Sequence, residues 1–215
     1  MSGLLNLTFY ITYVFLITTG SVTFIEALAT KDPMVRHILN IETVISIVAG
    51  FFYSRFVAML SSSPNYTQLL QTRYLDWSIT TPFMLLSLCL ALGSIRQRKP
   101  LYLGFLMGVI ALNYGMLLLG YLGEMGKMDK KLAWVTSFMC FGLMFGWIGW
   151  MYLGQFKVST EWIIFGLYVI LWSIYGFVYF AKDETKHMVY NVLDLCAKCL
   201  VGLFFWLYFT GIIAV

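Results

Sequence analysis

Seven long apolar stretches fill almost the whole chain. They run from 4 to 29, 34 to 60, 69 to 93, 101 to 123, 132 to 154, 160 to 181 and 188 to 214. Each exceeds the about 20 residues that a helix needs to cross a bilayer. Hydrophobic residues make up 60% of the 215 residues and charged residues only 11%, against about 45–50% and about 25% in soluble domains. The interior of a soluble chain of this length cannot bury so much apolar surface, so the sequence predicts an all-α membrane protein, a seven-transmembrane helix bundle.

Short connectors with charges or turn residues separate these stretches. They are residues 31–33, 61–64, 96–100, 124–131, 155–160 and 182–187. None is long enough for a further domain, so residues 1–215 are expected to form a single seven-helix transmembrane domain. The apolar runs are continuous and do not alternate with a period of two, which disfavours a β-barrel. The first stretch has no basic flank and is longer than the apolar core of a signal peptide, so we expect it to remain in the protein.

Basic residues in the connectors give the expected orientation. One set holds six of them, Lys31, Arg36, Arg96, Arg98, Lys99 and Lys157, and the other set holds five, Lys127, Lys130, Lys131, Lys182 and Lys186. The positive-inside rule then puts the N-terminus outside and the C-terminus in the cytoplasm. The net charge of +4 comes without a basic run, so no nucleic-acid partner is expected. Neither a phosphate-binding glycine loop, a nucleophile triad nor a metal-ligand set is present, and the chain is not expected to be an enzyme.

Lys198 is the most informative charged residue, because charges inside membrane spans are costly. It lies eleven residues past His187, hence roughly 16 Å along a helix, near the middle of the span. Asp194 precedes it by one turn on the same face. The two residues could be an ion pair that stabilises the helices. The alternative is a lysine that has condensed with an aldehyde, because such a nitrogen carries a single tunable proton and suits a buried site.

A polar stripe runs along the third apolar stretch. Asp76, Thr80 and Ser87 lie within about three full turns of one another and share one helix face. Thr80 and Ser87 could form hydrogen bonds between helices. Together with a carboxylate, they could instead line a path for a proton or an ion.

Three motifs carry a resemblance to a known family. The last stretch contains DLCAK at 194–198, the third contains RYLDW at 73–77 followed by TTP at 80–82, and the fourth ends in GYLGEMG at 120–126. The chain resembles the microbial, type 1 rhodopsins over all seven spans, and GYLGEMG resembles the proteorhodopsin branch. The short loops and the carboxylate Glu42 in the second stretch are similar to the rhodopsins of giant DNA viruses.

The resemblance implies retinal bound covalently to Lys198 as a protonated Schiff base. It makes Asp76 and Asp194 the counterions, with Asp76 as the proton acceptor. It also implies a supporting network and a retinal-binding pocket. The network matches Arg73, Thr80, Tyr53 and Tyr175, and the pocket matches Trp77, Thr81, Met84, Leu117, Trp134, Trp172, Tyr175 and Tyr179. Two positions depart from the family pattern: Gly176 replaces a common proline and Tyr179 a common tryptophan.

The cytoplasmic side differs from the usual proton pumps of this family. Ser87 stands where they carry Asp or Glu, and a serine cannot donate a proton at useful pH. Glu42, which the resemblance brings beside Ser87, is the candidate donor. It lies six residues past Arg36, roughly 9 Å into the helix, where burial favours its neutral form. Alternatively, Glu42 reaches toward water or pairs with Arg36.

Three functions remain in competition. An outward proton pump is favoured because Asp76 and Thr80 are both present. A light-gated ion channel is the main alternative, because Ser87 breaks the donor pattern; against it, Thr81 and Tyr114 stand where many channelrhodopsins place a Cys–Asp pair. A slowly cycling photosensor comes third. The expected partners are the lipid bilayer and further copies of the chain, with a homo-pentamer favoured over a trimer.

Overall fold

A computed structural model describes residues 3–60, 65–95, 100–153 and 159–213. The described residues form helices and the turns between them. The helices are α1 (Gly3–Ala29), α2 (Pro33–Leu60), α3 (Tyr66–Ile95), α4 (Leu103–Glu124), α5 (Lys130–Tyr152), α6 (Thr160–Val178), α7 (Asp183–Asp194), the π-helix η1 (Leu195–Leu200) and α8 (Val201–Phe209). Because α7, η1 and α8 are continuous, the described residues contain seven helices that are long and apolar enough to cross a membrane. The predicted all-α, seven-transmembrane class is confirmed.

The ends of the predicted spans differ from the observed helices by a few residues, and local chemistry explains the differences. Helix α5 begins at Lys130, earlier than predicted, because the carboxylate of Asp129 accepts the backbone N–H of Leu132 and caps the helix. Helix α7 begins at Asp183 with two acidic residues in its first turn, a placement that the helix dipole favours. A prediction based on apolar character excludes such charged turns. Residues 61–64, 96–99 and 154–158, which include much of three predicted connectors with Arg96, Arg98, Lys99 and Lys157, lie outside the described residues.

The chain divides into two compact units. Unit 1 comprises Met1–Asp76 and Leu171–Val215, and unit 2 comprises Trp77–Ile170. The boundary falls within α3 and within α6, so each of these helices contributes one part to each unit.

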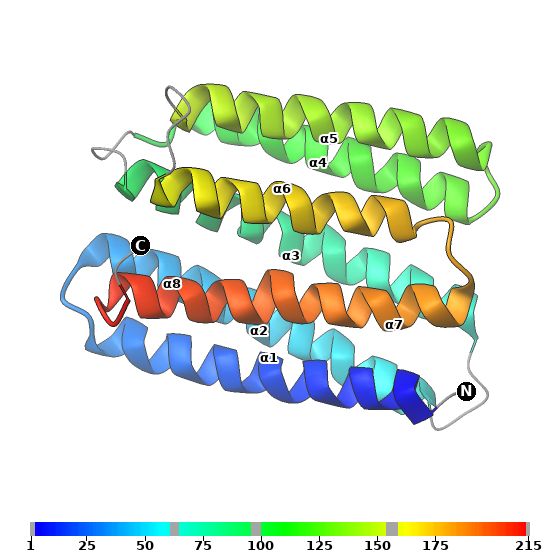
Figure 1. Cartoon of the computed structure of the whole chain (residues 1–215), viewed down its shortest axis with the longest axis horizontal. Helices are drawn as coiled ribbons and strands as arrows, with labels where there is room; N and C mark the ends of the chain where they lie inside the picture. The colour runs from blue at the N-terminus through cyan, green and yellow to red at the C-terminus, as the bar shows by residue number, and fades with distance from the viewer. Residues whose placement is uncertain (1–2, 61–64, 96–99, 154–158, 214–215) are drawn as a thin grey trace. The chain divides into compact units, whose positions relative to one another are not determined.

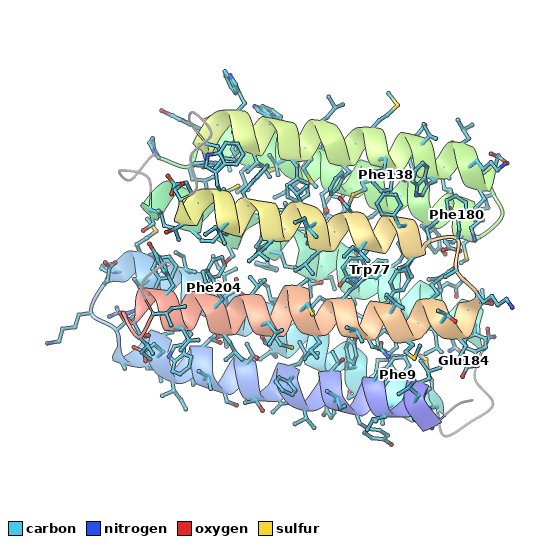
Figure 2. The ribbon with its side chains drawn as sticks, viewed as in Figure 1. Phe9, Trp77, Phe138, Phe180, Glu184 and Phe204 are labelled. Atoms are coloured by element: carbon cyan, nitrogen blue, oxygen red, sulfur yellow. The ribbon has the colours of Figure 1, made fainter. Side chains whose placement is uncertain are left out.

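In unit 1, α1 and α2 lie side by side and run in opposite directions, and α7, η1 and α8 pack against α1 (Figure 1). Aromatic side chains fill the interface between the first two helices: Phe9 of α1, labelled in Figure 2, packs against Tyr53 and Phe56 of α2. Further along the pair, a Cβ on Gly20 would meet the Cβ of Ser46 at 3.2 Å. This close approach explains why α1 carries a glycine there.

In unit 2, α4 and α5 form an antiparallel pair (Figure 1). The turn between them uses Gly126 with a φ of 67°, a left-handed conformation that glycine adopts without strain. At the other end of the pair, the ring of Trp147 fills the space above Gly108, where a Cβ would collide with it. Large apolar side chains on these helices stay exposed, with Leu103 at 72% and Trp150 at 77%, as lipid-facing residues are in a membrane protein.

Candidate functional site

Lys198 lies in η1, where the backbone departs from regular α-helix. The helix predicted to be continuous here contains six residues of π-helix, Leu195–Leu200, with Lys198 in its last turn. The π-turn is one residue wider than an α-turn, and such turns often occur at functional sites. The side chain of Lys198 is 1% exposed. An amine at this depth needs negative partners in contact with it.

Two buried carboxylates of unit 1 supply that charge. Lys198 Nζ donates a hydrogen bond to Asp76 Oδ2 at 2.7 Å and lies 3.6 Å from Asp194 Oδ1. Both carboxylates are fully buried. The sequence predicted that these three residues act together, and the structure brings them together, with Asp76 closer to the amine.

Arg73 completes the charge balance. Its Nη1 lies 3.0 Å from Asp194 Oδ2, and its side chain is fully buried. Two cations, Arg73 and Lys198, therefore face two carboxylates, Asp76 and Asp194, so the cluster is neutral overall. The guanidinium carbon also lies 4.9 Å from the ring centre of Phe56, and such a cation–π contact helps to hold a buried arginine.

Tyrosines fix the position of Asp194. Tyr53 donates to Asp194 Oδ2 at 2.8 Å and Tyr175 donates to Asp194 Oδ1 at 2.7 Å. With the bond from Arg73, both oxygens of Asp194 accept strong hydrogen bonds, which stabilise its carboxylate. Asp76 is consequently the better placed of the two to take up a proton from Lys198.

Asn191 belongs to this network, although the sequence analysis missed it. Its Oδ1 accepts from Arg73 Nη2 at 2.7 Å, its Nδ2 donates to Thr8 Oγ1 at 3.0 Å, and its backbone oxygen accepts from Thr12 Oγ1 at 3.0 Å. The available signal was its spacing, three residues before Asp194 and seven before Lys198. Asn191 thereby ties the charged cluster to α1.

Glu42 lies on the other side of Lys198 along the last span. Its side chain is 1% exposed, and a Cβ on Gly202, one turn past Lys198, would meet Glu42 Oε2 at 3.2 Å. Glu42 therefore does not reach toward water. Arg36 instead donates to the backbone oxygen of Thr30 at 2.7 Å.

Buried hydroxyl groups lie on the helices around Glu42. Thr23 and Thr43 share a hydrogen bond of 2.8 Å between their hydroxyl oxygens. The hydroxyl of Ser46 is buried without a hydrogen-bond partner among the described residues, and the hydroxyl of Thr19 is buried beside the Cys199 thiol. These groups line the interfaces that α1 and α2 form with each other and with α8, in place of an entirely apolar environment.

The remaining predicted site residues lie in both units. In unit 1, Trp172 and Tyr179 are buried and Tyr175 is half-buried. In unit 2, Trp77, Thr80, Thr81, Met84 and Ser87 are buried on α3, whereas Leu117 and Trp134 are half-buried on α4 and α5. Trp77 and Phe138, the latter in ring contact with Trp134 at 4.6 Å, are labelled in Figure 2. Their role in binding a chromophore stays a prediction.

Thr81 and Tyr114, which were matched to the positions of the channelrhodopsin Cys–Asp pair, are not partners in unit 2. Thr81 Oγ1 accepts a hydrogen bond of 2.8 Å from Asn113 Nδ2, while Tyr114 is 47% exposed. Successive residues of a helix point about 100° apart, so an error of one residue moves the partner to a different face. The α4 partner of Thr81 is thus a neutral amide, Asn113.

Glu26 and Arg55, two charged residues outside the cluster around Lys198, each contact an aromatic side chain. Glu26 Oε2 accepts a hydrogen bond of 3.4 Å from Trp206 Nε1, which joins the cytoplasmic ends of α1 and α8 in the predicted orientation. Arg55 is exposed, with its guanidinium carbon 5.9 Å from the ring centre of Phe51.

In the part of the chain that the structure describes, no group of three His, Cys, Asp or Glu side chains could hold a metal ion.

Comparisons with known proteins identify the family. A model of bacteriorhodopsin-like proteins matches residues 3–212. The chain belongs to the bacteriorhodopsin-like family. It is therefore a microbial rhodopsin, an integral multi-pass membrane protein of a light-driven retinal family whose members are transporters or sensors and not enzymes. The predicted resemblance is confirmed.

Individual relatives agree with this family. The crystal structure of the viral rhodopsin OLPVRII is 42% identical, has a TM-score of 0.92 and covers 98% of this chain and 100% of that one. Opsin-1 of Neurospora crassa is 33% identical over 155 residues, which is 63% of this chain, and the match spans about half (47%) of that relative's length. The light-driven proton pump Coccomyxa subellipsoidea rhodopsin CsR, at 17% identity, a TM-score of 0.78 and 96% and 97% coverage of the two chains, shows the shared fold alone.

Proposed function

We propose that this rhodopsin is a light-driven outward proton pump with retinal linked to Lys198. The observation that carries the proposal is the arrangement around the Lys198 nitrogen. A buried carboxylate, Asp76, accepts its hydrogen bond at 2.7 Å, and a second buried carboxylic group, Glu42, lies against Gly202 one turn further along the same span. One nitrogen thus lies between a close acceptor and a separate source of protons.

The residues around Lys198 fit retinal. A free ammonium could be satisfied by one carboxylate, whereas this nitrogen has two carboxylates and an arginine that neutralises the excess negative charge. Such a neutral cluster stabilises a nitrogen that must be protonated in the dark and lose its proton in the light. Bound retinal would supply the light absorption and isomerisation that redirect the N–H of Lys198.

The protein's own residues then move the proton in one direction. Asp76 takes the proton from the Lys198 nitrogen because it is the nearest base. Asp194 stays fixed by Tyr53, Tyr175 and Arg73 and compensates the positive charge. Glu42 returns a proton to the nitrogen from the opposite side, through water that the hydroxyls near Gly202 can hold. Ser87, which lies in unit 2, contributes a hydroxyl and no proton.

Light-driven pH changes in a suspension of cells or inside-out vesicles test this function. The wild type should acidify the cell exterior, and Asp76→Asn should abolish this transport because the acceptor is lost. Glu42→Gln should keep the dark colour and the fast loss of the nitrogen's proton, but should slow its return, and added azide should restore the rate. Wild-type transport by Asp76→Asn, or an unchanged return in Glu42→Gln, would contradict the proposal.

A light-gated channel is the second candidate. The specific observation in its favour is the set of buried hydroxyls near Glu42, including Thr19, Ser46 and the Thr23–Thr43 pair, because such groups could bind water and ions when the helices separate. Photocurrents recorded under voltage clamp distinguish the two functions. A current that reverses its sign with voltage identifies a channel, whereas a pump current keeps its direction.

The arrangement in the membrane forms part of the proposal. We infer a single retinal-binding domain over residues 1–215, with its N-terminus outside and its C-terminus in the cytoplasm, and assembly into a homo-pentamer. The exposed apolar residues along α1, such as Ile25 at 65% and Leu28 at 70%, leave a helix face available for lipid or for another copy. Sizing in mild detergent tests the assembly, and a clean monomer under several conditions would contradict it.

A further inference from the structure

His187 continues the functional stripe of the last span toward its beginning. His187, Asn191, Asp194 and Lys198 follow one another at spacings of four, three and four residues, which keeps them on one helix face. Glu184, labelled in Figure 2, lies at the same end of α7. In the proposed orientation this is the extracellular side, from which a pumped proton must leave.

The imidazole of His187 is buried and held in one orientation. It is 1% exposed and stacks on the ring of Tyr66, with 5.7 Å between the centroids and 17° between the planes. It also bonds to the backbone of Tyr66, while its Nδ1 has no hydrogen-bond partner among the described residues. The bonded nitrogen is therefore Nε2, which donates to the backbone carbonyl, and in the neutral ring Nδ1 remains as an acceptor.

Arg73 carries a buried N–H donor that complements the acceptor Nδ1 of His187. Its Nη1 and Nη2 bind Asp194 and Asn191, whereas its buried Nε has no hydrogen-bond partner in the described parts of the chain. Arg73 is bound through Nη2 to Asn191, which lies on the same face of α7 as His187. His187 lies one turn, about 6 Å along the axis, from Asn191, and two hydrogen bonds of about 2.8–3.0 Å through one water span such a distance.

The other charged groups around His187 are two cations and two carboxylates. Of the carboxylates, Glu184 lies three residues earlier on α7 and is half-buried. Lys186, on the same helix, acts on the ring electrostatically, and its side chain is 2% exposed, with Nζ 3.9 Å from Asp183 Oδ1. Asp183 itself is 64% exposed. Tyr66 of α3 contributes its ring and its backbone carbonyl. An excess proton would be repelled by the two cations, so this site suits a neutral water that passes protons on and does not store one.

We propose that His187 Nδ1 and Arg73 Nε hold a water molecule between them, which makes His187 a positioning residue for Arg73 on the exit path. Buried donors and acceptors without partners are the groups that internal waters satisfy. The water offsets the cost of burying Nε and so keeps the guanidinium beside Asp194. The inference rests on the proposed pump for its role in transport, but the water site itself requires only the pigment.

Two variants distinguish the role of the Nδ1 acceptor from the role of the aromatic ring. His187→Phe keeps the stacking on Tyr66 and removes the acceptor, whereas His187→Asn provides an amide oxygen near the position of Nδ1. Without the acceptor, the buried position of Arg73 is less stable than one that points outward, so less positive charge remains near Asp76. The acid-induced red shift that reports protonation of Asp76 should then occur about one pH unit higher in His187→Phe. In His187→Asn it should stay close to the wild type.

Infrared difference spectra in D2O and proton-release kinetics complete the test. A water O–D stretching band should be lost in His187→Phe and kept in His187→Asn, and release detected with a pH-sensitive dye should be delayed only in His187→Phe. Equal behaviour of the two variants would overturn the inference.

If His187→Phe forms no pigment, His187→Leu takes its place. Nitrogen NMR of the wild type, assigned against His187→Asn because the chain has 2 histidines, must show one unprotonated ring nitrogen. If the His187 variants show the predicted acid titrations but the wild type transports no protons, the pump is refuted and the water site remains supported.

Discussion

Gly202→Ala tests whether Glu42 acts from its observed position. The new Cβ would lie 3.0 Å from Thr19 Cγ2 and 3.2 Å from Glu42 Oε2, whereas ordinary contacts begin at 3.4 Å. The neighbours must therefore move by about 0.2–0.4 Å to reach ordinary contact. The methyl group also favours the helix by roughly 0.5–1 kcal/mol relative to glycine, which offsets part of the crowding, so the fold and the dark colour should persist.

The expected effect is kinetic. Misplacing a reacting group by about 1 Å costs about 100-fold in rate. If the logarithm of the rate falls linearly with displacement, the shift of about 0.2 Å that Glu42 Oε2 requires slows proton return to the Lys198 nitrogen about two- to threefold. Gly202→Val should slow it further, because its additional methyl groups displace the carboxyl group more.

Flash photolysis measures this step as recovery of the visible absorbance after the Lys198 nitrogen has lost its proton. Gly142→Ala is the matched control, because nothing lies within 4 Å of the Cβ it would add, and its kinetics should match those of the wild type. A wild-type rate in both Gly202→Ala and Gly202→Val would refute the position assigned to the donor. Slowing in the control by the same factor would show that the assay reports general helix packing.

Two further predictions concern the chromophore. Lys198→Ala should give no visible absorbance after retinal is added, because no other buried amine lies beside Asp76 in the described structure; a pigment of unchanged colour would contradict the linkage. Met84 is 3% exposed, and its apolar side chain predicts green absorption, so Met84→Gln should shift the band to the blue. A red shift would contradict the assignment of Met84 to the retinal-binding pocket.

The charged residues of the site were predictable because a charge inside a membrane span requires an explanation. Lys198, Asp194 and Asp76 stand out from apolar surroundings in the sequence, and they meet in the structure at 2.7 and 3.6 Å. Neutral polar residues give no such signal. Asn191 resembles any amide in a helix that begins with polar residues, and only the position of Arg73 shows that its oxygen holds the guanidinium.

Backbone features were harder to predict than side-chain roles. The π-helix at 195–200 contains neither proline nor glycine, so nothing in its composition distinguishes it from an α-helix. Gly202 was one glycine among 18, and its importance depends on which helix packs against it. Asn113 was missed in favour of Tyr114 because the register of α4 against Thr81 depends on packing, and sequence periodicity leaves an uncertainty of one residue.

The two sides of Lys198 differ in a way that fits the proposed direction of proton movement. Toward the beginning of α7, the nitrogen meets a charged cluster whose members are fixed by short hydrogen bonds, so its proton can cross 2.7 Å to Asp76 without reorganising the neighbours. Toward α8, it meets Glu42 across a turn of helix and a set of hydroxyl groups. Transfer on that side requires water to enter first and is therefore slower. Fast loss to a preorganised acceptor, followed by slow return from a donor that must be hydrated, is the order that outward transport requires.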